Sequence, residues 1–262
     1  LPPASVFGDR PKFSVRIRGH NVALTFNGQT EFEVTCPPIR FIASDIVNNC
    51  NLRCPFCLLD YSTVTKTELM TEETFRSLLR LLPILPEAGF WLSCLHEPTL
   101  HPKLNRFIDL IPRTERHKFW FTTNLAKPID DETFEHWAVS GLHHINVSLD
   151  TLNAELHAIL RKFGRFDVFI DNVERMAEVF RRNPEAPKIR YITLALRSTV
   201  GEIPQLVTQT RELYHAHENE VRHVFQMSHI GGDFRRDHYL DRDEWPALGE
   251  RLERLGYRRV VV

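Results

Sequence analysis

Short apolar runs alternate with segments of helical period along most of the chain. Six runs rich in aliphatic and aromatic residues predict strands at residues 39–46, 90–94, 119–123, 144–149, 189–196 and 221–227. Between and after these runs, apolar residues recur at intervals of three and four, which places them on one face of a helix. Helices are therefore expected at residues 71–82, 104–111, 130–139, 153–160, 166–180, 202–214 and 243–255.

The first of these helices shows how the signals combine. Phe75, Leu78, Leu79 and Leu82 follow the i, i+3, i+4, i+7 spacing, and Thr71 precedes them as a candidate N-cap. A strand followed by a helix and a further parallel strand is almost always joined by a right-handed crossover. We therefore expect an α/β fold, a partial (β/α)6 TIM-like barrel, with its chemistry beyond the carboxyl ends of the strands.

The two ends of the chain show other patterns. Residues 13–34 alternate between apolar and polar positions around an Asn27-Gly28 turn signal, which predicts a small N-terminal β-hairpin appendage within residues 1–38. The barrel is expected at residues 39–232, and a C-terminal helix and strand at residues 233–262. Because the chain starts at Leu1 and closes on a helix that leads into a strand, we expect it to be an excerpt of a longer polypeptide.

Composition narrows the class of protein. The hydrophobic share of 42% is ordinary for a globular chain, and 33 Lys and Arg nearly cancel 34 Asp and Glu, which gives a net charge of -1. Binding to nucleic acid would therefore need a local basic patch, and the sequence shows none. It also shows neither a membrane-spanning run nor a signal peptide. We expect a cytoplasmic protein with no nucleic-acid or membrane partner.

The cysteine spacing is the sharpest chemical signal. Cys50, Cys54 and Cys57 form a C-x3-C-x2-C run directly after the first strand of the barrel, whereas Cys36 and Cys94 lie far from it in sequence. Three thiolates on one loop can hold three irons of a [4Fe-4S] cluster and leave the fourth iron open, as a catalytic metal centre requires. A structural zinc site or a ferredoxin-like electron carrier would require a fourth ligand nearby in the sequence. A non-catalytic zinc- or iron-sulfur-binding module stays the alternative.

Four further segments follow the cysteine run in order. They are LSCLHEPTLHP at residues 92–102, TTN at 122–124, VSLD at 147–150 and RKFGRF at 161–166. Together with the cysteines, this order resembles the radical SAM superfamily, including its SPASM-type peptide-modifying branch, although no cysteine follows Cys94. One departure is clear: Cys94 and His96 stand where the family usually has glycines, which let the backbone approach the cofactor.

The resemblance implies the cofactors and their ligands. The family binds a [4Fe-4S] cluster and S-adenosylmethionine and generates a 5'-deoxyadenosyl radical that abstracts hydrogen. By resemblance Cys50, Cys54 and Cys57 are the cluster ligands, Phe56 contacts the adenine, and Glu97 accepts the methionine ammonium.

Polar residues after the later strands are assigned to the rest of the cofactor. The resemblance implies contacts with the ribose hydroxyls or the methionine carboxylate by Asn124, Ser148, Asp150, Arg161 and Arg197. Ordinary structural roles stay open for several of them: Asp150 could cap a helix, Ser148 could satisfy the backbone at a strand end, and Arg161 could lie on a solvated face.

Two residues are candidates for catalysis on the substrate. Cys94 could donate a hydrogen atom to a substrate radical, or be a small buried apolar residue, and His229 could bind substrate beside a Gly231-Gly232 loop. The substrate is expected to be a peptide or a small metabolite, possibly a sugar. The family also implies an electron donor such as flavodoxin or ferredoxin.

Overall fold

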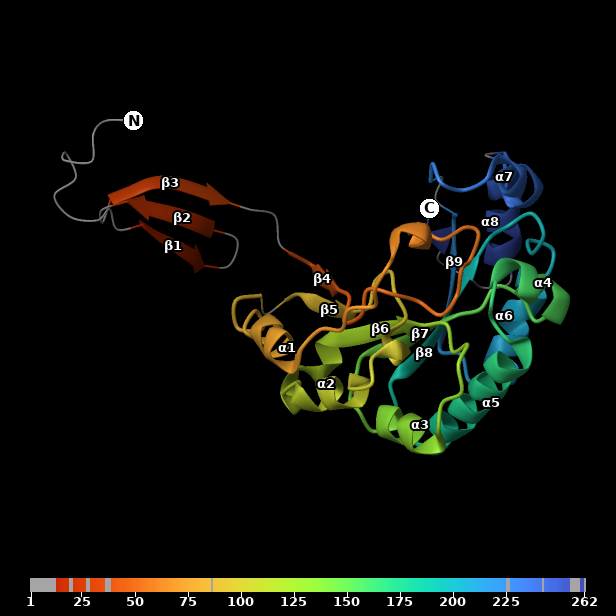
Figure 1. Ribbon diagram of the computed structural model, residues 1–262, viewed down its shortest axis with the longest axis horizontal. Helices are drawn as coiled ribbons and strands as arrows, with labels where there is room; N and C mark the ends of the chain where they lie inside the picture. Colours follow the sequence, from red (N-terminus) through yellow and green to blue (C-terminus); the bar gives the residue numbers. More distant parts are fainter. Residues whose placement is uncertain are drawn as a thin grey trace.

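A seven-stranded parallel sheet organises the computed structural model, which describes residues 13–18, 21–26, 29–35, 39–85, 87–224, 227–241, 243–254 and 260–261 (Figure 1). The strands lie in the order β10-β9-β8-β7-β6-β5-β4. Their bounds are β4 (Phe41–Ser44), β5 (Gly89–Leu92), β6 (Phe119–Thr123), β7 (His144–Ser148), β8 (Lys188–Leu194), β9 (Glu218–Arg222) and β10 (Val260–Val261). The first six of these strands in chain order correspond to the predicted runs. The partial barrel predicted from the sequence is therefore confirmed, and β10 falls on the strand expected at the end of the chain.

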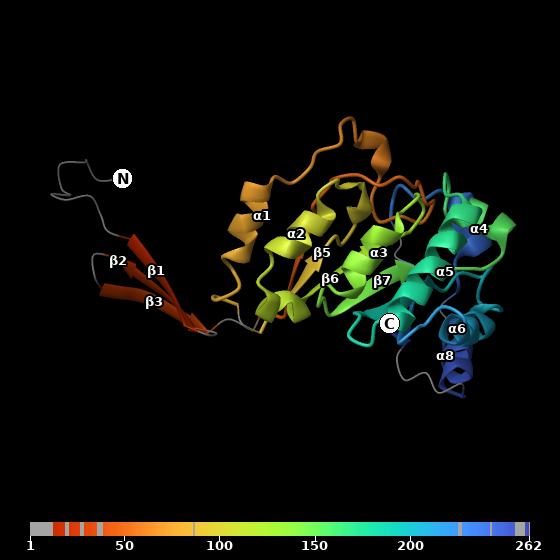
Figure 2. The ribbon, with the colours of Figure 1, turned by 90° about the horizontal axis from the view of Figure 1, so that it is seen from below.

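The helices follow the strands as the periodicity predicts. They are α1 (Glu72–Leu79), α2 (Leu104–Leu110), α3 (Asp131–Ala138), α4 (Ala154–Leu160), α5 (Phe166–Arg182), α6 (Ile203–Glu212), α7 (Gly232–His238) and α8 (Glu244–Arg254). Figure 2 shows α1, α2, α3 and α5 side by side along one face of the sheet. In the described part of the chain no helix is long and apolar enough to cross a bilayer.

Strand alternation divides the side chains between two faces of the sheet. In β6, Phe119 and Phe121 are fully buried in the core beneath the helices, while Trp120 and Thr122 lie half-buried on the other face. The same alternation continues in β7, where Ile145 belongs to that core. The helix-covered face is therefore packed, and the opposite, concave face carries polar and aromatic side chains around the barrel lumen.

An antiparallel sheet precedes the barrel, as the alternation at residues 13–34 predicts. It contains β1 (Phe13–Arg18), β2 (Asn21–Phe26) and β3 (Gln29–Thr35) in the order β1-β2-β3. Figure 1 shows it to one side of the parallel sheet, beyond β4. The Asn27-Gly28 turn and Cys36 lie outside the described residues.

Two differences from the sequence-based expectation involve charged segments. β9 begins at Glu218, three residues before the expected start at Val221. The sequence pattern did not indicate these first residues, because Glu218 and Glu220 interrupt any apolar run there. The expected end of this strand reaches residues 225 and 226, which lie outside the described part. α7 occupies a charged stretch for which no helix was predicted, since none of its side chains is buried and no apolar stripe marks it.

Candidate active site

Three cysteines share one cavity at the carboxyl end of the sheet. Cys50, Cys54 and Cys57 lie on the loop after β4 and line a cavity of about 140 Å³. Backbone N–H groups donate to two of the sulfurs, from Leu52 to Cys50 Sγ and from Leu59 to Cys57 Sγ, each at 3.4 Å. Hydrogen bonds of this kind to the sulfurs are one of the means by which proteins tune an iron-sulfur cluster.

An arginine inside the cysteine run fixes the shape of the loop. Arg53 Nη1 donates to the carbonyls of Cys50 at 2.6 Å and Leu52 at 2.7 Å, and its guanidinium lies 4.8 Å from the centroid of the Tyr61 ring. Tyr61 is itself tied to the β5 side of the site through its hydroxyl, which donates to the Leu95 carbonyl. Arg53 was not identified from the sequence, because its position within the run carries no spacing signal of its own.

A glycine lets a distant segment pack against the cysteine loop. A Cβ on Gly164 would lie 2.8 Å from the Arg161 carbonyl oxygen and 3.3 Å from Leu52 Cδ2. The same approach allows Arg53 N–H to donate to the Lys162 carbonyl at 3.0 Å. The R-x-x-G segment therefore supports the loop that carries the cysteines. Gly164 is needed in this segment because a side chain there would collide with its neighbours.

A buried ion pair closes one wall of the cavity. Asp150 Oδ2 lies 2.6 Å from Arg161 Nη2, and the two side chains are 1% and 12% exposed. Arg161 Nη1 is 3.8 Å from Cys54 Sγ, and its guanidinium lies 5.3 Å from the centroid of the Phe56 ring. Burial opposes the charge of Arg161, but Asp150 and Cys54 outweigh it and raise the arginine pKa. Asp150 Oδ1 accepts from the Leu194 N–H, so this carboxylate orients Arg161 and caps no helix.

A second buried carboxylate joins three segments of the cavity wall. Glu97 Oε1 accepts from the N–H and hydroxyl of Thr99 and from the Thr123 hydroxyl, and Oε2 accepts from the Asn124 N–H at 2.7 Å. Burial raises the pKa of Glu97, although these hydrogen bonds oppose it. An ionised carboxylate has about four acceptor positions, so Oε2 keeps one for an ammonium group. Asn124 Nδ2 donates to Asn51 Oδ1 and to Cys50 Sγ, and so links this wall to the cysteine loop.

The turn after β5, where Cys94 and His96 replace family glycines, is built in an unusual way. Ser93 has a φ of 106°, a backbone conformation that favours glycine. Asp45 Oδ1 accepts the backbone N–H groups of Cys94, Leu95 and His96 at 3.0 to 3.2 Å. A single carboxylate from the end of β4 thus holds the turn in place. Asp45 was not identified from the sequence, because its partners lie about fifty residues away.

The structure brings most of the predicted residues together and leaves two outside. Phe56, Cys94 and Ser148 line the cysteine cavity and also an adjoining cavity of about 200 Å³ toward the lumen. Arg197 does not join them, because its guanidinium pairs with Asp241 and Glu244 and lines none of the described cavities.

His229 also lies outside the cavities. Its Nε2 is 2.9 Å from the Cys57 carbonyl oxygen, on an exposed side chain. This contact places the His229 ring against the backbone of the cysteine loop, where it can hold the loop in position. The Gly231-Gly232 pair is ordered here as the start of α7.

The donor set fits an iron-sulfur cluster better than a single ion. In the described part of the chain no three His, Cys, Asp or Glu side chains converge on a point that one metal ion could occupy. A cube, in contrast, separates its three thiolate ligands to different corners. Burial raises the pKa of the Cys50 thiol to about 12 and also raises those of Cys54 and Cys57, so binding iron displaces their protons.

A neighbouring donor fits a carboxylate-bearing cofactor. Arg161 Nε is buried in this cavity wall and has no hydrogen-bond partner among the described residues. A guanidinium whose other nitrogens are already oriented is well suited to bind a carboxylate group. The residues present therefore fit a cluster on the three cysteines and, beside it, a cofactor that carries an amino-acid group.

Comparison with known proteins agrees with this geometry. The sequence profile of the Radical SAM superfamily matches residues 45–203, which contain the cysteine loop and the walls just described. The chain belongs to the radical SAM superfamily. The cofactors of this family are a [4Fe-4S] cluster and S-adenosylmethionine, and among the fold's solved neighbours is a crystal structure bound to S-adenosylmethionine.

The relatives of this radical SAM chain include proteins named for nucleotide chemistry. A Methanocaldococcus jannaschii protein named probable GTP 3',8-cyclase is 25% identical over 181 residues, which are 67% of this chain and 56% of that protein. The GTP 3',8-cyclase of Rippkaea orientalis is 32% identical over 140 residues, covering 48% of this chain and 40% of that protein. This radical SAM chain thus spans about half the length of the curated relatives it matches.

Solved structures agree on the radical SAM fold. Streptococcus suis SuiB superposes with a TM-score of 0.61 at 18% identity, over 82% of this chain and 46% of that one. A radical SAM methyltransferase from Sphaerobacter thermophilus gives 0.58 at 13% identity, over 94% and 74%. At these identities the likeness concerns the fold of the barrel.

Proposed function

We propose that this chain cleaves S-adenosylmethionine reductively on a [4Fe-4S] cluster held by Cys50, Cys54 and Cys57, and starts radical chemistry on a small substrate. The observation that carries the proposal is the three-cysteine cavity with the unpartnered, buried Arg161 Nε in its wall. When bound, the cluster and its nucleoside supply a 5'-deoxyadenosyl radical that abstracts hydrogen from the substrate.

The chain's own residues bind and orient the cofactor in this proposal. Arg161, held by Asp150, donates Nε–H to the methionine carboxylate, and Glu97 Oε2 accepts from its ammonium. Ser148 has no side-chain hydrogen bond among the described residues and faces both cavities, so its hydroxyl is free for a ribose hydroxyl. Phe56, in contact with Arg161, provides an apolar surface for the adenine.

The substrate class is inferred from the size of the cavity in the lumen and from the names of the curated relatives. The cavity of about 200 Å³ beside Cys94 lies along the concave face of the sheet and has room for part of a small molecule, since whole ligand sites usually start at about 300 Å³. Of the expected substrate classes, a small metabolite agrees with the two curated relatives named above, because both carry the name of a GTP cyclase, whereas a peptide or a sugar has no support among them. We therefore propose a purine nucleotide or a similar anionic heteroaromatic molecule, with a low-potential protein such as flavodoxin or ferredoxin as the one-electron donor.

Cys94 is proposed as a hydrogen-atom donor to the substrate radical. It lies between the cysteine cavity and the lumen, and burial followed by the nearby Asp45 raises its pKa, which keeps the S–H bond intact at neutral pH. In this step the substrate radical takes the hydrogen atom and forms a C–H bond, leaving a thiyl radical. One electron from the same external donor and one proton from water then restore the thiol.

Anaerobic reconstitution tests the proposal. The chain should bind about four iron and four sulfide and, with dithionite, convert S-adenosylmethionine to 5'-deoxyadenosine and methionine in equal amounts. Cys50→Ser, Cys54→Ser and Cys57→Ser should each abolish both iron binding and deoxyadenosine formation, while Cys94→Ser serves as the control for iron content. Deoxyadenosine from any of the three variants, or stoichiometric zinc in place of iron, would contradict the proposal and favour a non-catalytic module.

A further inference from the structure

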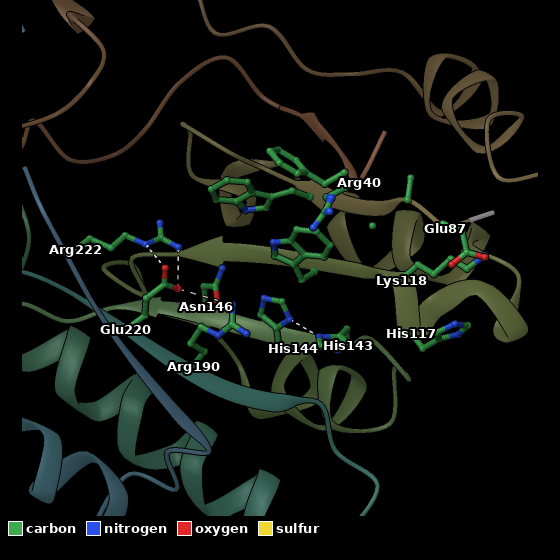
Figure 3. Close-up of a pocket in the computed structure, with 15 residues that line it drawn as sticks. Arg40, Glu87, His117, Lys118, His143, His144, Asn146, Arg190, Glu220 and Arg222 are labelled. Atoms are coloured by element: carbon green, nitrogen blue, oxygen red, sulfur yellow. Dashed lines mark hydrogen bonds and ion pairs between the residues drawn. The ribbon is translucent and has the colours of Figure 1, made fainter. Parts of the chain in front are cut away.

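A large cavity lies in the lumen at the opposite end of the strands from the cysteines. Its volume is about 710 Å³, within the range of small-molecule sites (Figure 3). Its lining residues lie before or within the first three positions of β4 to β9, except for Arg222, the last residue of β9. Trp91 and Arg222 line this lower cavity and also the 200 Å³ cavity that contains Cys94. The two cavities therefore share a wall. A molecule bound in the lower cavity lies next to the cavity that contains Cys94.

Aromatic rings form one wall of the lower cavity. Trp91 and Trp120 are stacked with centroids 6.4 Å apart and planes inclined by 25°. Trp120 also stacks on His144, at 5.2 Å and 20°. Trp120 therefore lies between two rings, and all three residues line the cavity, where an aromatic ligand can meet their exposed edges.

Guanidinium groups lie beside these rings. Arg190 pairs with Glu218 at 2.6 Å, and Arg222 holds Glu220 with two hydrogen bonds at 2.9 and 3.0 Å. Arg190 Nη1 also lies 3.8 Å from Glu220 Oε2, so Glu220 lies between the two arginines. A guanidinium has five N–H donors, so each arginine keeps N–H groups beyond its hydrogen bonds to these carboxylates. Figure 3 shows Arg190, Glu220 and Arg222 together at one side of the cavity.

Arg40 adds a charge at the mouth of the cavity. It is exposed and makes no ion pair with the described residues. Such a group can attract an anion before it reaches the paired arginines deeper in the lumen.

Two buried polar atoms in the same wall lack partners. Asn146 Oδ1 and His144 Nε2 make no hydrogen bond with the described residues, although the residues are 1% and 4% exposed. Their other ends are fixed, because Asn146 Nδ2 donates to Thr122 Oγ1 and His144 Nδ1 lies 2.6 Å from His143 Nδ1. Buried polar atoms without partners are uncommon, and here they sit where a ligand's edge could satisfy them.

We propose that this lower cavity, defined by Trp91, Trp120, His144, Asn146, Arg190 and Arg222, is the substrate-anchoring subsite of the enzyme. It takes a planar heteroaromatic ring that carries an anionic group. The ring lies against the edges of Trp120 and His144, and its polar edge pairs with Asn146 Oδ1 and His144 Nε2. The anion binds Arg40 and the Nη1–H groups of Arg190, which lie 3.8 Å from Glu220 Oε2. The inference rests on the proposed function, which places radical formation at the cysteine end of the barrel. The part of the bound substrate that faces this end is the part that reacts.

Calorimetry with the full, reconstituted chain tests the subsite directly. GTP is the probe, with guanosine and inorganic triphosphate as separate arms that carry only the ring or only the anion. Trp120→Leu and Arg190→Gln should each weaken GTP binding about 10-fold or more, because each removes an aromatic or a charge-assisted contact. Trp120→Leu should also weaken guanosine binding, and Arg190→Gln should weaken triphosphate binding. Arg182→Gln, on the exposed part of α5 and 60% exposed, is the matched control and should leave all three unchanged.

The outcomes separate this inference from the proposed function. Iron content equal to that of the parent shows that each variant is folded, so a loss of binding can be assigned to the cavity. If the parent chain cleaves S-adenosylmethionine but binds none of the three probes at millimolar concentration, or if both variants bind GTP like the parent, the subsite is overturned while the proposed function stands. If GTP binds with the expected variant effects but no deoxyadenosine forms, the subsite stands and the proposed function fails.

Discussion

The carboxylate of Asp150 lies 2.6 Å from the guanidinium of Arg161, and this pair connects the end of β7 with the wall of the cysteine cavity. Both partners are nearly inaccessible to water, so neither charge can be left alone without a large penalty. Asp150 also accepts the Leu194 N–H from β8, which fixes the carboxylate before it meets the arginine. The pair therefore sets the orientation of a buried cation whose Nε has no partner among the described residues.

Asp150→Asn tests whether this orientation matters. The amide keeps an acceptor for Leu194 but leaves the Arg161 charge uncompensated, so the free energy of unfolding should fall by about 3 kcal/mol. Binding of S-adenosylmethionine should weaken about 10-fold, since the arginine is no longer held. Urea unfolding and calorimetry measure the two effects. Arg161→Lys should weaken binding to a similar degree, and the double variant should lose less than the sum of the two. Full additivity would show that the residues act independently.

Gly164→Ala tests the packing of the R-x-x-G segment on the cysteine loop. The new methyl group would lie 2.8 Å from the Arg161 carbonyl, so the segment must shift away from Leu52, at a cost of about 1–3 kcal/mol in the free energy of unfolding. Iron content after reconstitution should fall as well, because the loop loses its support. Gly249→Ala in α8 is the control: it has open space around its Cβ position and should stabilise the helix by up to about 1 kcal/mol. Equal effects of the two substitutions would rule out the steric account.

The residues that sequence patterns identified share one property. The cysteines, Glu97 and Asp150 follow directly after apolar runs that are themselves recognisable as strands, so strand position alone placed them at one end of the sheet. Arg197 was also placed by this rule, yet its side chain turns toward Asp241 on the surface. The rule locates the backbone and leaves open which way a long side chain points.

The residues that sequence patterns missed depend on contacts between distant segments. Asp45 accepts N–H groups from the turn after β5, a relationship that leaves no periodic trace in the sequence. The lumen residues Trp120 and His144 occupy alternate positions in strands whose other positions are apolar, so they read as parts of buried strands. Only the curvature of the sheet shows that they face a cavity.

Ser93 gives a test of backbone strain at the turn after β5. Its φ of 106° is costly for any residue with a Cβ, and its hydroxyl donates to the His96 carbonyl. Ser93→Ala removes the hydrogen bond and keeps the strain, whereas Ser93→Gly removes both. We therefore expect the glycine variant to be more stable than the alanine variant by about 1–2 kcal/mol in thermal or urea unfolding. The opposite order, which is normal in strands and helices, would show that the turn is not strained at this position.

His157 predicts a loss of stability in mild acid. It is 4% exposed in α4, its ring is 5.2 Å from Phe169, and burial, followed by the charge of Arg161, lowers its pKa to about 4. Between the ordinary value of 6.5 and this lowered value, the unfolded chain binds a proton that the folded chain does not. The stabilisation from a neutral His157 is therefore complete above pH 6.5 and is lost as the pH falls.

Each pH unit in that window costs up to about 1.4 kcal/mol, so about 2 kcal/mol should be lost between pH 7.5 and pH 5 on account of His157. His157→Phe keeps the aromatic packing and removes the titrating group, along with a buried Nδ1 that has no hydrogen-bond partner among the described residues. Urea unfolding at both pH values should therefore show a smaller acid loss for the variant by about this amount, with its stability at pH 7.5 no lower than that of the parent. Because every other titrating group is common to the two chains, the difference isolates His157. Parallel losses in the parent and the variant would mean that the ring takes up its proton as easily in the folded chain as in the unfolded one.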